Sequence, residues 1–119
     1  MKVLSLIIKQ EFFDQILSGE KKQEFREIRP NTEKKYCEID EDGFAKEIDG
    51  VLIPRKYDAI QFYVGYNKDR DNALVEIKDA NIELFVDDEG NFIEYEYQGD
   101  ICTAAQIVYD LGDVLNKNV

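Results

Sequence analysis

The sequence predicts an α+β fold that is mostly β, built as one domain over residues 1–119. One segment, residues 10–18, carries apolar residues at helical spacing, whereas most other apolar segments alternate with the period of two expected of strands. A chain of 119 residues has room for one hydrophobic core, and 14 Phe and Tyr residues without a Trp supply much of its packing volume.

Residues 3–9 are the first expected strand. Leu4, Leu6 and Ile8 share one of its faces, and the other face is also mostly apolar. Two apolar faces suit an interior strand of a closed or nearly closed sheet, because such a strand is covered on both sides.

A short amphipathic helix is expected over residues 10–18. Its apolar residues fall at helical spacing; they are Phe12, Phe13, Ile16 and Leu17. Gly19 follows directly and can adopt the left-handed conformation that ends a helix. Beyond this glycine the residue period changes from about 3.6 to 2, so a charged strand is expected to begin.

Four ionisable residues lie at this change from helix to strand. Glu24 and Arg26 are two positions apart and project from one face of the expected strand. Lys22 lies on the same side, and Lys21 lies at the bend. Such a cluster is either a binding site or the solvated face of a strand, since charged residues are mostly exposed.

This order of strand, helix, glycine and charged strand resembles the ASCH domain family, a branch of the PUA-like superfamily. The matching pattern is Gly19-x-Lys21-x-x-Glu24-x-Arg26, and the resemblance covers the first third of the chain. It implies a small PUA-like β-barrel with one or two helices at its rim and a cleft beside this segment. Family members bind RNA or nucleosides there, and some small bacterial members hydrolyse acetylated cytidine.

Residues 31–57 carry the weakest sequence signals of the chain. Arg29-Pro30 ends the charged strand, because proline lacks a backbone donor and restricts the residue before it. Residues 31–33 are expected to cap a short helical turn. Residues 38–53 form either a hairpin around residues 41–43 or a long loop.

A second set of candidate ligand-binding residues lies in and after the expected strand at residues 57–66. Tyr63 and Tyr66 offer aromatic faces on which a nucleobase can stack, and Arg70 offers a contact for a phosphate. The alternative is that both tyrosines complete the core and the rim of the sheet. Gly65 marks a bulge or a close approach to the backbone.

The remaining segments are expected to be strands. Residues 72–86 form one long strand that bends near residues 79–81, where the parity of the apolar positions changes. Residues 87–91 are a turn that leads into the strand at residues 92–97. The closing strand, residues 103–115, is expected to end near Gly112.

The charge of the chain is distributed unevenly. The net charge is −11, yet residues 1–36 carry eight basic and six acidic residues. Residues 79–116 contain ten acidic residues and no basic one. A surface of this kind repels a phosphate backbone, so tight, sequence-independent binding to duplex nucleic acid is disfavoured. A single nucleotide or a short flexible strand near Lys21, Lys22, Arg26 and Arg29 is compatible with it.

Other classes of function are disfavoured by composition. No segment is long and apolar enough to span a bilayer, and the amino terminus lacks the pattern of a secretory signal, so a cytoplasmic location is expected. Cys37 and Cys102 are expected to be reduced thiols. Without histidine or clustered thiols, no zinc site and no cofactor are predicted.

Three functions follow as hypotheses. The first is a module that binds a nucleotide, a nucleoside or single-stranded RNA through Lys21, Glu24, Arg26, Tyr63, Tyr66 and Arg70. The second is a small amidohydrolase acting on an acetylated cytidine-like nucleoside, with Lys21 and Glu24 as the catalytic residues. The related hydrolases place a threonine where this chain has Glu24, so Glu24 would have to act as a general base. The third is an acidic module that binds a basic protein through residues 79–116.

Overall fold

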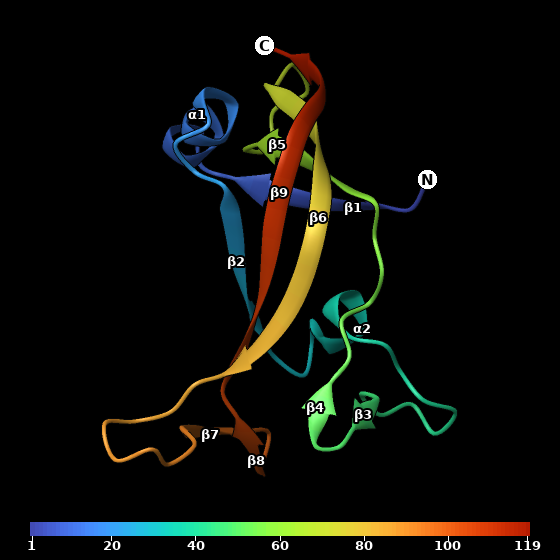
Figure 1. Cartoon of the computed structure of the whole chain (residues 1–119), viewed down its shortest axis with the longest axis vertical. Helices are drawn as coiled ribbons and strands as arrows, with labels where there is room; N and C mark the ends of the chain where they lie inside the picture. The colour runs from blue at the N-terminus through green and yellow to red at the C-terminus, as the bar shows by residue number, and fades with distance from the viewer. The chain divides into compact units, whose positions relative to one another are not determined.

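The longest strands are β6 (Asn72–Leu84) and β9 (Ala105–Asn118) in the computed structural model, which describes residues 1–119 (Figure 1). The chain forms two compact units, and both long strands contribute to each of them. Unit 1 consists of Met1–Glu24, Lys56–Asp79 and Tyr109–Val119, and unit 2 consists of Phe25–Arg55 and Ala80–Val108.

The main sheet has five strands in the order β1-β5-β6-β9-β2, where β1 is Val3–Ile8, β5 is Ala59–Val64 and β2 is Gln23–Ile28. With two helices and many strands, the α+β, mostly β prediction is confirmed. The sheet is not closed, because β1 and β2 are the two ends of the strand order, and the expected barrel is therefore not confirmed.

β1 is an edge strand, and its predicted interior position is wrong. It pairs in parallel with β5 and has no second neighbour in the strand order. Leu4, Leu6 and Ile8 are buried as expected, whereas Val3 and Ser5 on the other face are exposed. Two apolar faces in the sequence thus do not fix the number of neighbouring strands, which depends on pairing between distant segments.

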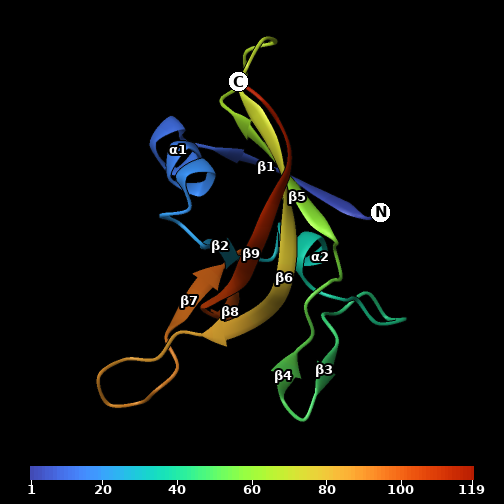
Figure 2. The same cartoon turned by 45° about the horizontal axis from the view of Figure 1, so that its top comes forward.

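Unit 1 has its core between α1 (Gln10–Ser18) and one face of the sheet. Figures 1 and 2 both show α1 beside β1. The register aligns Leu6 with Phe62 and Phe62 with Ala73, so these three side chains share one face. The buried residues of α1, β1, β5 and β6 are Leu4, Leu6, Ile8, Phe13, Ile16, Ala59, Ile60, Phe62, Ala73 and Val75.

Unit 2 contains α2 (Glu33–Tyr36) and two short hairpins, β3 (Glu47–Ile48) with β4 (Val51–Leu52) and β7 (Glu94–Tyr97) with β8 (Asp100–Thr103). Each hairpin turns through two residues with positive φ, Asp49 and Gly50 in the first and Gln98 and Gly99 in the second. Turns of this kind match the twist of the flanking strands, and glycine adopts them without steric cost. Neither helix of the chain is of the length and apolar character needed to cross a membrane.

Three details of the sequence prediction differ from the structure. The segment at residues 38–53 has the expected turn at residues 41–43, between the bridged residues Ile39 and Ala45, but it also holds a second turn in the β3–β4 hairpin. Strand β8 was not predicted. Strand β9 runs on to Asn118, because the missing side chain of Gly112 makes room for the Glu76 carboxylate. This glycine allows a close approach and does not end the strand.

The buried thiol of Cys37 gives unit 2 a pH-dependent stability. Burial, with a smaller contribution from the Glu33 carboxylate, raises the pKa of Cys37 from 9.0 to about 11. Because the folded pKa lies above the unfolded one, the stabilisation is complete below about pH 9 and is lost as the pH rises through 11. We expect unfolding in urea at pH 8 and pH 10 to show a loss of about 1 kcal/mol from this thiol.

The matched variant is Cys37→Ala, which removes the titrating group. Tyr95 also has a raised pKa, so it too lowers the free energy of unfolding as the pH rises. The effect of Cys37 is therefore the difference between the unmodified protein and Cys37→Ala. The free energy of unfolding of Cys37→Ala should fall less steeply between pH 8 and pH 10. Equal slopes in both proteins would show that the Cys37 thiol does not ionise differently in the folded state.

Candidate functional site

Lys21 and Glu24 are brought together at the end of α1. Gly19 has a φ of 85°, and its N–H donates to the carbonyl of Ile16, which closes the helix as predicted. The N–H of Lys21 then donates to the carbonyl of Gln15 at 3.0 Å. These backbone hydrogen bonds hold residues 19–21 against the last turn of α1, and they fix the backbone position from which the Lys21 side chain extends.

Glu24 is a buried carboxylate, with only 6% of the residue exposed. Lys21 Nζ lies 3.6 Å from Glu24 Oε1, and the two side chains are 18% and 8% exposed. Lys21 Nζ also lies 5.7 Å from the centroid of the Phe12 ring. A charge is costly to bury unless it is paired, and the ammonium of Lys21 offsets this cost.

Arg26, the last residue of the matching pattern, belongs to unit 2 and is half-buried. The chain passes from unit 1 to unit 2 within β2, between Glu24 and Phe25. The structure therefore joins Lys21 to Glu24 and assigns Arg26 to the other unit.

Tyr63 and Arg70 form a second pair in unit 1. The guanidinium carbon of Arg70 lies 4.2 Å from the centroid of the Tyr63 ring, a distance typical of a cation–π contact. Arg70 Nη1 also donates to the carbonyl of Gly65 at 2.9 Å. Tyr66 is 86% exposed in the loop after β5, so it is not the buried core residue of the alternative interpretation.

The sheet face that carries Tyr63 is mixed, because polar Ser5, Gln61 and Asn72 lie on it beside apolar Ile7 and Leu74. The register aligns Ser5 with Gln61 on neighbouring strands, and Tyr63 with Asn72. Gln61 Nε2 donates to Asn72 Oδ1 at 3.1 Å, which orients both amides. This face of unit 1 thus offers amide groups next to an aromatic ring stacked on an arginine.

A groove in unit 2 was not found from the sequence. It has a volume of about 400 Å³, within the range of roughly 300–1,000 Å³ typical of ligand sites. Its lining includes Arg29, Glu33, Phe44, Leu52, Leu84 and Tyr95. These residues come from both halves of the chain, and no local pattern connects them.

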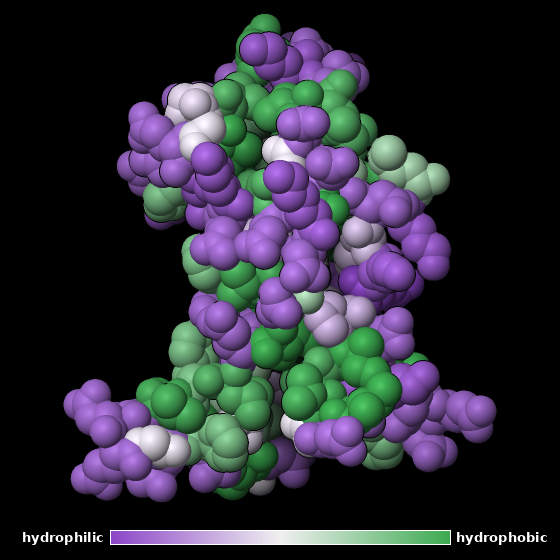
Figure 3. Space-filling model, viewed as in Figure 1, coloured by the Kyte–Doolittle hydropathy of each residue, from purple (hydrophilic) through white to green (hydrophobic).

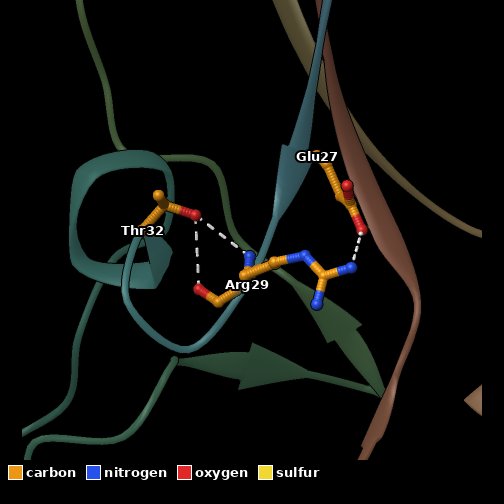
Figure 4. Close-up of polar contacts among 3 residues, drawn as sticks. All are labelled: Glu27, Arg29 and Thr32. Carbon is orange, nitrogen blue, oxygen red and sulfur yellow. Dashed lines mark hydrogen bonds and ion pairs between the residues drawn. The ribbon is translucent and has the colours of Figure 1, made fainter. Parts of the chain in front are cut away.

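Arg29 is the cation of this groove. Its guanidinium carbon lies 4.6 Å from the centroid of the Tyr95 ring, and its Nη2 lies 3.0 Å from Glu27 Oε1. Figure 4 shows that the Thr32 hydroxyl accepts from the N–H of Arg29 and donates to its carbonyl. Thr32 therefore closes the turn after β2. It is also the N-cap residue of the short helix α2, as expected for residues 31–33, although its side chain makes no capping hydrogen bond.

Tyr95 lies opposite Cys102 in the β7–β8 hairpin. Burial raises the pKa of the Tyr95 phenol, the neighbouring Cys102 thiol adds to the rise, and the charge of Arg29 opposes it. The phenol is consequently a neutral donor at physiological pH. No group of three or more His, Cys, Asp or Glu side chains is arranged to hold a metal ion.

The six predicted site residues thus divide into the pair Lys21 and Glu24, the pair Tyr63 and Arg70, the exposed Tyr66, and Arg26 in unit 2. The amino-acid sequence does not indicate that Glu24 is buried, because charged residues are mostly exposed. No protein-family model, curated protein or solved structure matches the chain, so the resemblance to the ASCH family rests on its own first third.

Proposed function

We propose that residues 1–119 are one ASCH-type, PUA-like domain that binds a nucleoside, a nucleotide or a short single-stranded RNA at Lys21 and Glu24. The observation that carries the proposal is the buried Glu24 carboxylate with Lys21 Nζ at 3.6 Å. β1, α1, Gly19 and β2 follow one another in the order on which the resemblance rests, which supports the assignment.

The chemistry of the Lys21–Glu24 pair suits a nucleobase. A charge-assisted hydrogen bond between an ammonium and a carboxylate is about 2.7–2.9 Å long, so a pair at 3.6 Å interacts mainly through its charges. A carboxylate offers about four lone-pair sites, and the amino group of a base can donate to one of them. Lys21 then supplies a compact positive charge for an acceptor on the base or for a phosphate.

The second pair of unit 1 supports the same class of ligand. Proteins that bind unpaired bases stack them on aromatic rings and on arginine planes, and Tyr63 and Arg70 provide one of each. Tyr63 follows Phe62 on β5 and so lies on the sheet face away from α1. In the proposed mode Tyr63 and Arg70 contact a second base or phosphate of a short strand, while Gln61 and Asn72 add polar groups on that face.

The charge of unit 1 favours a small ligand. Unit 1 carries nine basic and eleven acidic residues, whereas unit 2 carries six basic and fifteen acidic ones. Binding to a long phosphate backbone requires many basic contacts, and neither unit has an excess of them. A nucleoside or a short single strand needs few.

The proposal is tested by two-dimensional amide NMR while nucleosides, acetylated cytidine or a short single-stranded RNA are added. We expect shifts confined to residues 19–26 and 61–72, and a Kd about tenfold weaker for Glu24→Gln, because a hydrogen bond to a charged group is lost. Lys22→Ala removes a neighbouring exposed charge and should bind as the unmodified protein does.

A second variant covers the case in which Glu24→Gln does not fold. Tyr63→Leu removes the aromatic face while keeping an apolar side chain on β5, and it should weaken binding of the short single-stranded RNA. Spectra without shifts for every ligand would overturn the proposal. Growth of a free acetate signal with acetylated cytidine would instead assign Lys21 and Glu24 to hydrolysis.

A further inference from the structure

Unit 2 exposes many large apolar side chains. Six of them are more than half exposed, among them Phe44 at 70%; they are Phe44, Ile48, Val51, Val86, Phe92 and Ile101. Figure 3 shows hydrophobic residues gathered over the β3–β4 and β7–β8 hairpins. Clustered exposed apolar surface is typical of an interaction site.

The groove of unit 2 is continuous with this apolar surface. Phe44 is both an exposed apolar residue and part of the groove lining, where it is joined by Leu52, Leu84 and Tyr95. A groove of about 400 Å³ with such a lining accepts one or two apolar side chains of a partner. Anchor residues in pockets of this kind supply much of the free energy of protein binding.

The charges around the groove are mainly negative. Glu33 and Glu47 belong to its lining, and Glu27 lies 3.0 Å from Arg29, the basic residue of the lining. Unit 2 as a whole carries fifteen acidic and six basic residues. A partner that brings Lys or Arg next to apolar anchors is therefore complementary to this surface.

We propose that the groove of unit 2 binds a basic amphipathic segment of another protein. In this mode apolar side chains of the segment lie against Phe44, Leu84 and Tyr95, and its Lys or Arg side chains pair with Glu33 and Glu47. An amphipathic helix fits this description, because its apolar and charged side chains fall on opposite faces. A second copy of the chain is disfavoured, since two surfaces with the same large negative charge repel each other. Nucleic acid is disfavoured for the same reason.

The test uses a synthetic amphipathic peptide of leucine and lysine, about five helical turns long. Its binding to the full chain is measured by fluorescence anisotropy at low and at high salt. A peptide of the same composition, reordered so that the apolar face is lost, is the control ligand. We expect the amphipathic peptide to bind more tightly and the binding to weaken with salt, because both the apolar and the charged contacts contribute.

Matched variants test whether the peptide binds in the groove. Phe44→Ala and Glu47→Lys should each weaken binding about tenfold. Tyr66→Ala removes an aromatic ring that is even more exposed than Phe44 but lies in unit 1, and Asp69→Lys makes the same charge change as Glu47→Lys in unit 1. Both control variants should bind as the unmodified protein does.

Several results would overturn the proposal. Equal losses with Glu47→Lys and Asp69→Lys would show diffuse attraction to a negative protein. Self-association of the chain that Phe44→Ala abolishes, measured by sedimentation, would assign the groove to a second copy. Because all groove variants lie in unit 2, their outcome is independent of ligand binding at Lys21 and Glu24.

Discussion

Phe62→Ala is expected to lower the free energy of unfolding by about 3–5 kcal/mol. Phe62 is fully buried in β5, and the register aligns it with Leu6 on one side and Ala73 on the other. Removing the ring deletes apolar surface and leaves a cavity, because the paired strands on both sides restrict collapse. Domains of this size are stable by about 5–15 kcal/mol, so the variant loses a large part of its stability.

Urea unfolding followed by circular dichroism measures this loss. Tyr66→Ala is the matched control in the same unit, since its ring is 86% exposed and its removal should change the free energy by less than about 0.5 kcal/mol. A loss below about 1 kcal/mol for Phe62→Ala would contradict the packing of this strand. A loss of several kcal/mol for Tyr66→Ala would mean that its loop packs in solution.

The elements of unit 1 could be predicted because their signals are local. Apolar residues at helical spacing from Phe12 to Leu17 predict α1, and Gly19 predicts its end. The helix is observed at Gln10–Ser18. The alternation of residues 57–66 and 72–86 gives β5 and β6. Each of these signals lies within about 15 residues of sequence, which is the range in which periodicity is informative.

Unit 2 was harder to predict, since its strands are short. β3 and β4 have two residues each, which is too short for an alternating pattern to be detected in the sequence. Their turn residues did carry a signal, because Asp49-Gly50 is a sequence typical of a two-residue hairpin turn. Gly99 marks the turn of the β7–β8 hairpin in the same way. Sheet closure and edge positions depend on pairing between distant strands, and no local pattern reports them.

The candidate sites follow the same division. Lys21 and Glu24 are three positions apart across one bend, so their proximity could be expected from the sequence. The groove of unit 2 joins Arg29, Phe44 and Tyr95, which are far apart in the chain. The sequence indicates Arg29 only as one of four basic residues near a bound nucleotide or strand, whereas its contact with Tyr95 on β7 depends on the fold.

Lys21→Met should lower the free energy of unfolding by about 2–3 kcal/mol, because it leaves the Glu24 carboxylate without the ammonium 3.6 Å away. The value is below the 3–5 kcal/mol of fully buried pairs, since Lys21 is 18% exposed and water reaches it. Methionine keeps the apolar stem near Phe12, so the change isolates the charge. Lys22→Met, at an exposed neighbouring position, is the control.

The double variant Lys21→Met/Glu24→Gln distinguishes a structural pair from a ligand-binding one. If the unpaired charge causes the loss, neutralising Glu24 as well should recover about half of the lost stability. The double variant will then be destabilised by less than the sum of the two single variants. Ligand affinity of the same four proteins is then measured by the NMR titration. A recovered stability with ligand binding still weakened means that Lys21 and Glu24 contact the ligand. Unchanged binding in the stable double variant would mean that the pair serves only the fold of unit 1, because neutral side chains could not replace charged contacts to a nucleobase or a phosphate.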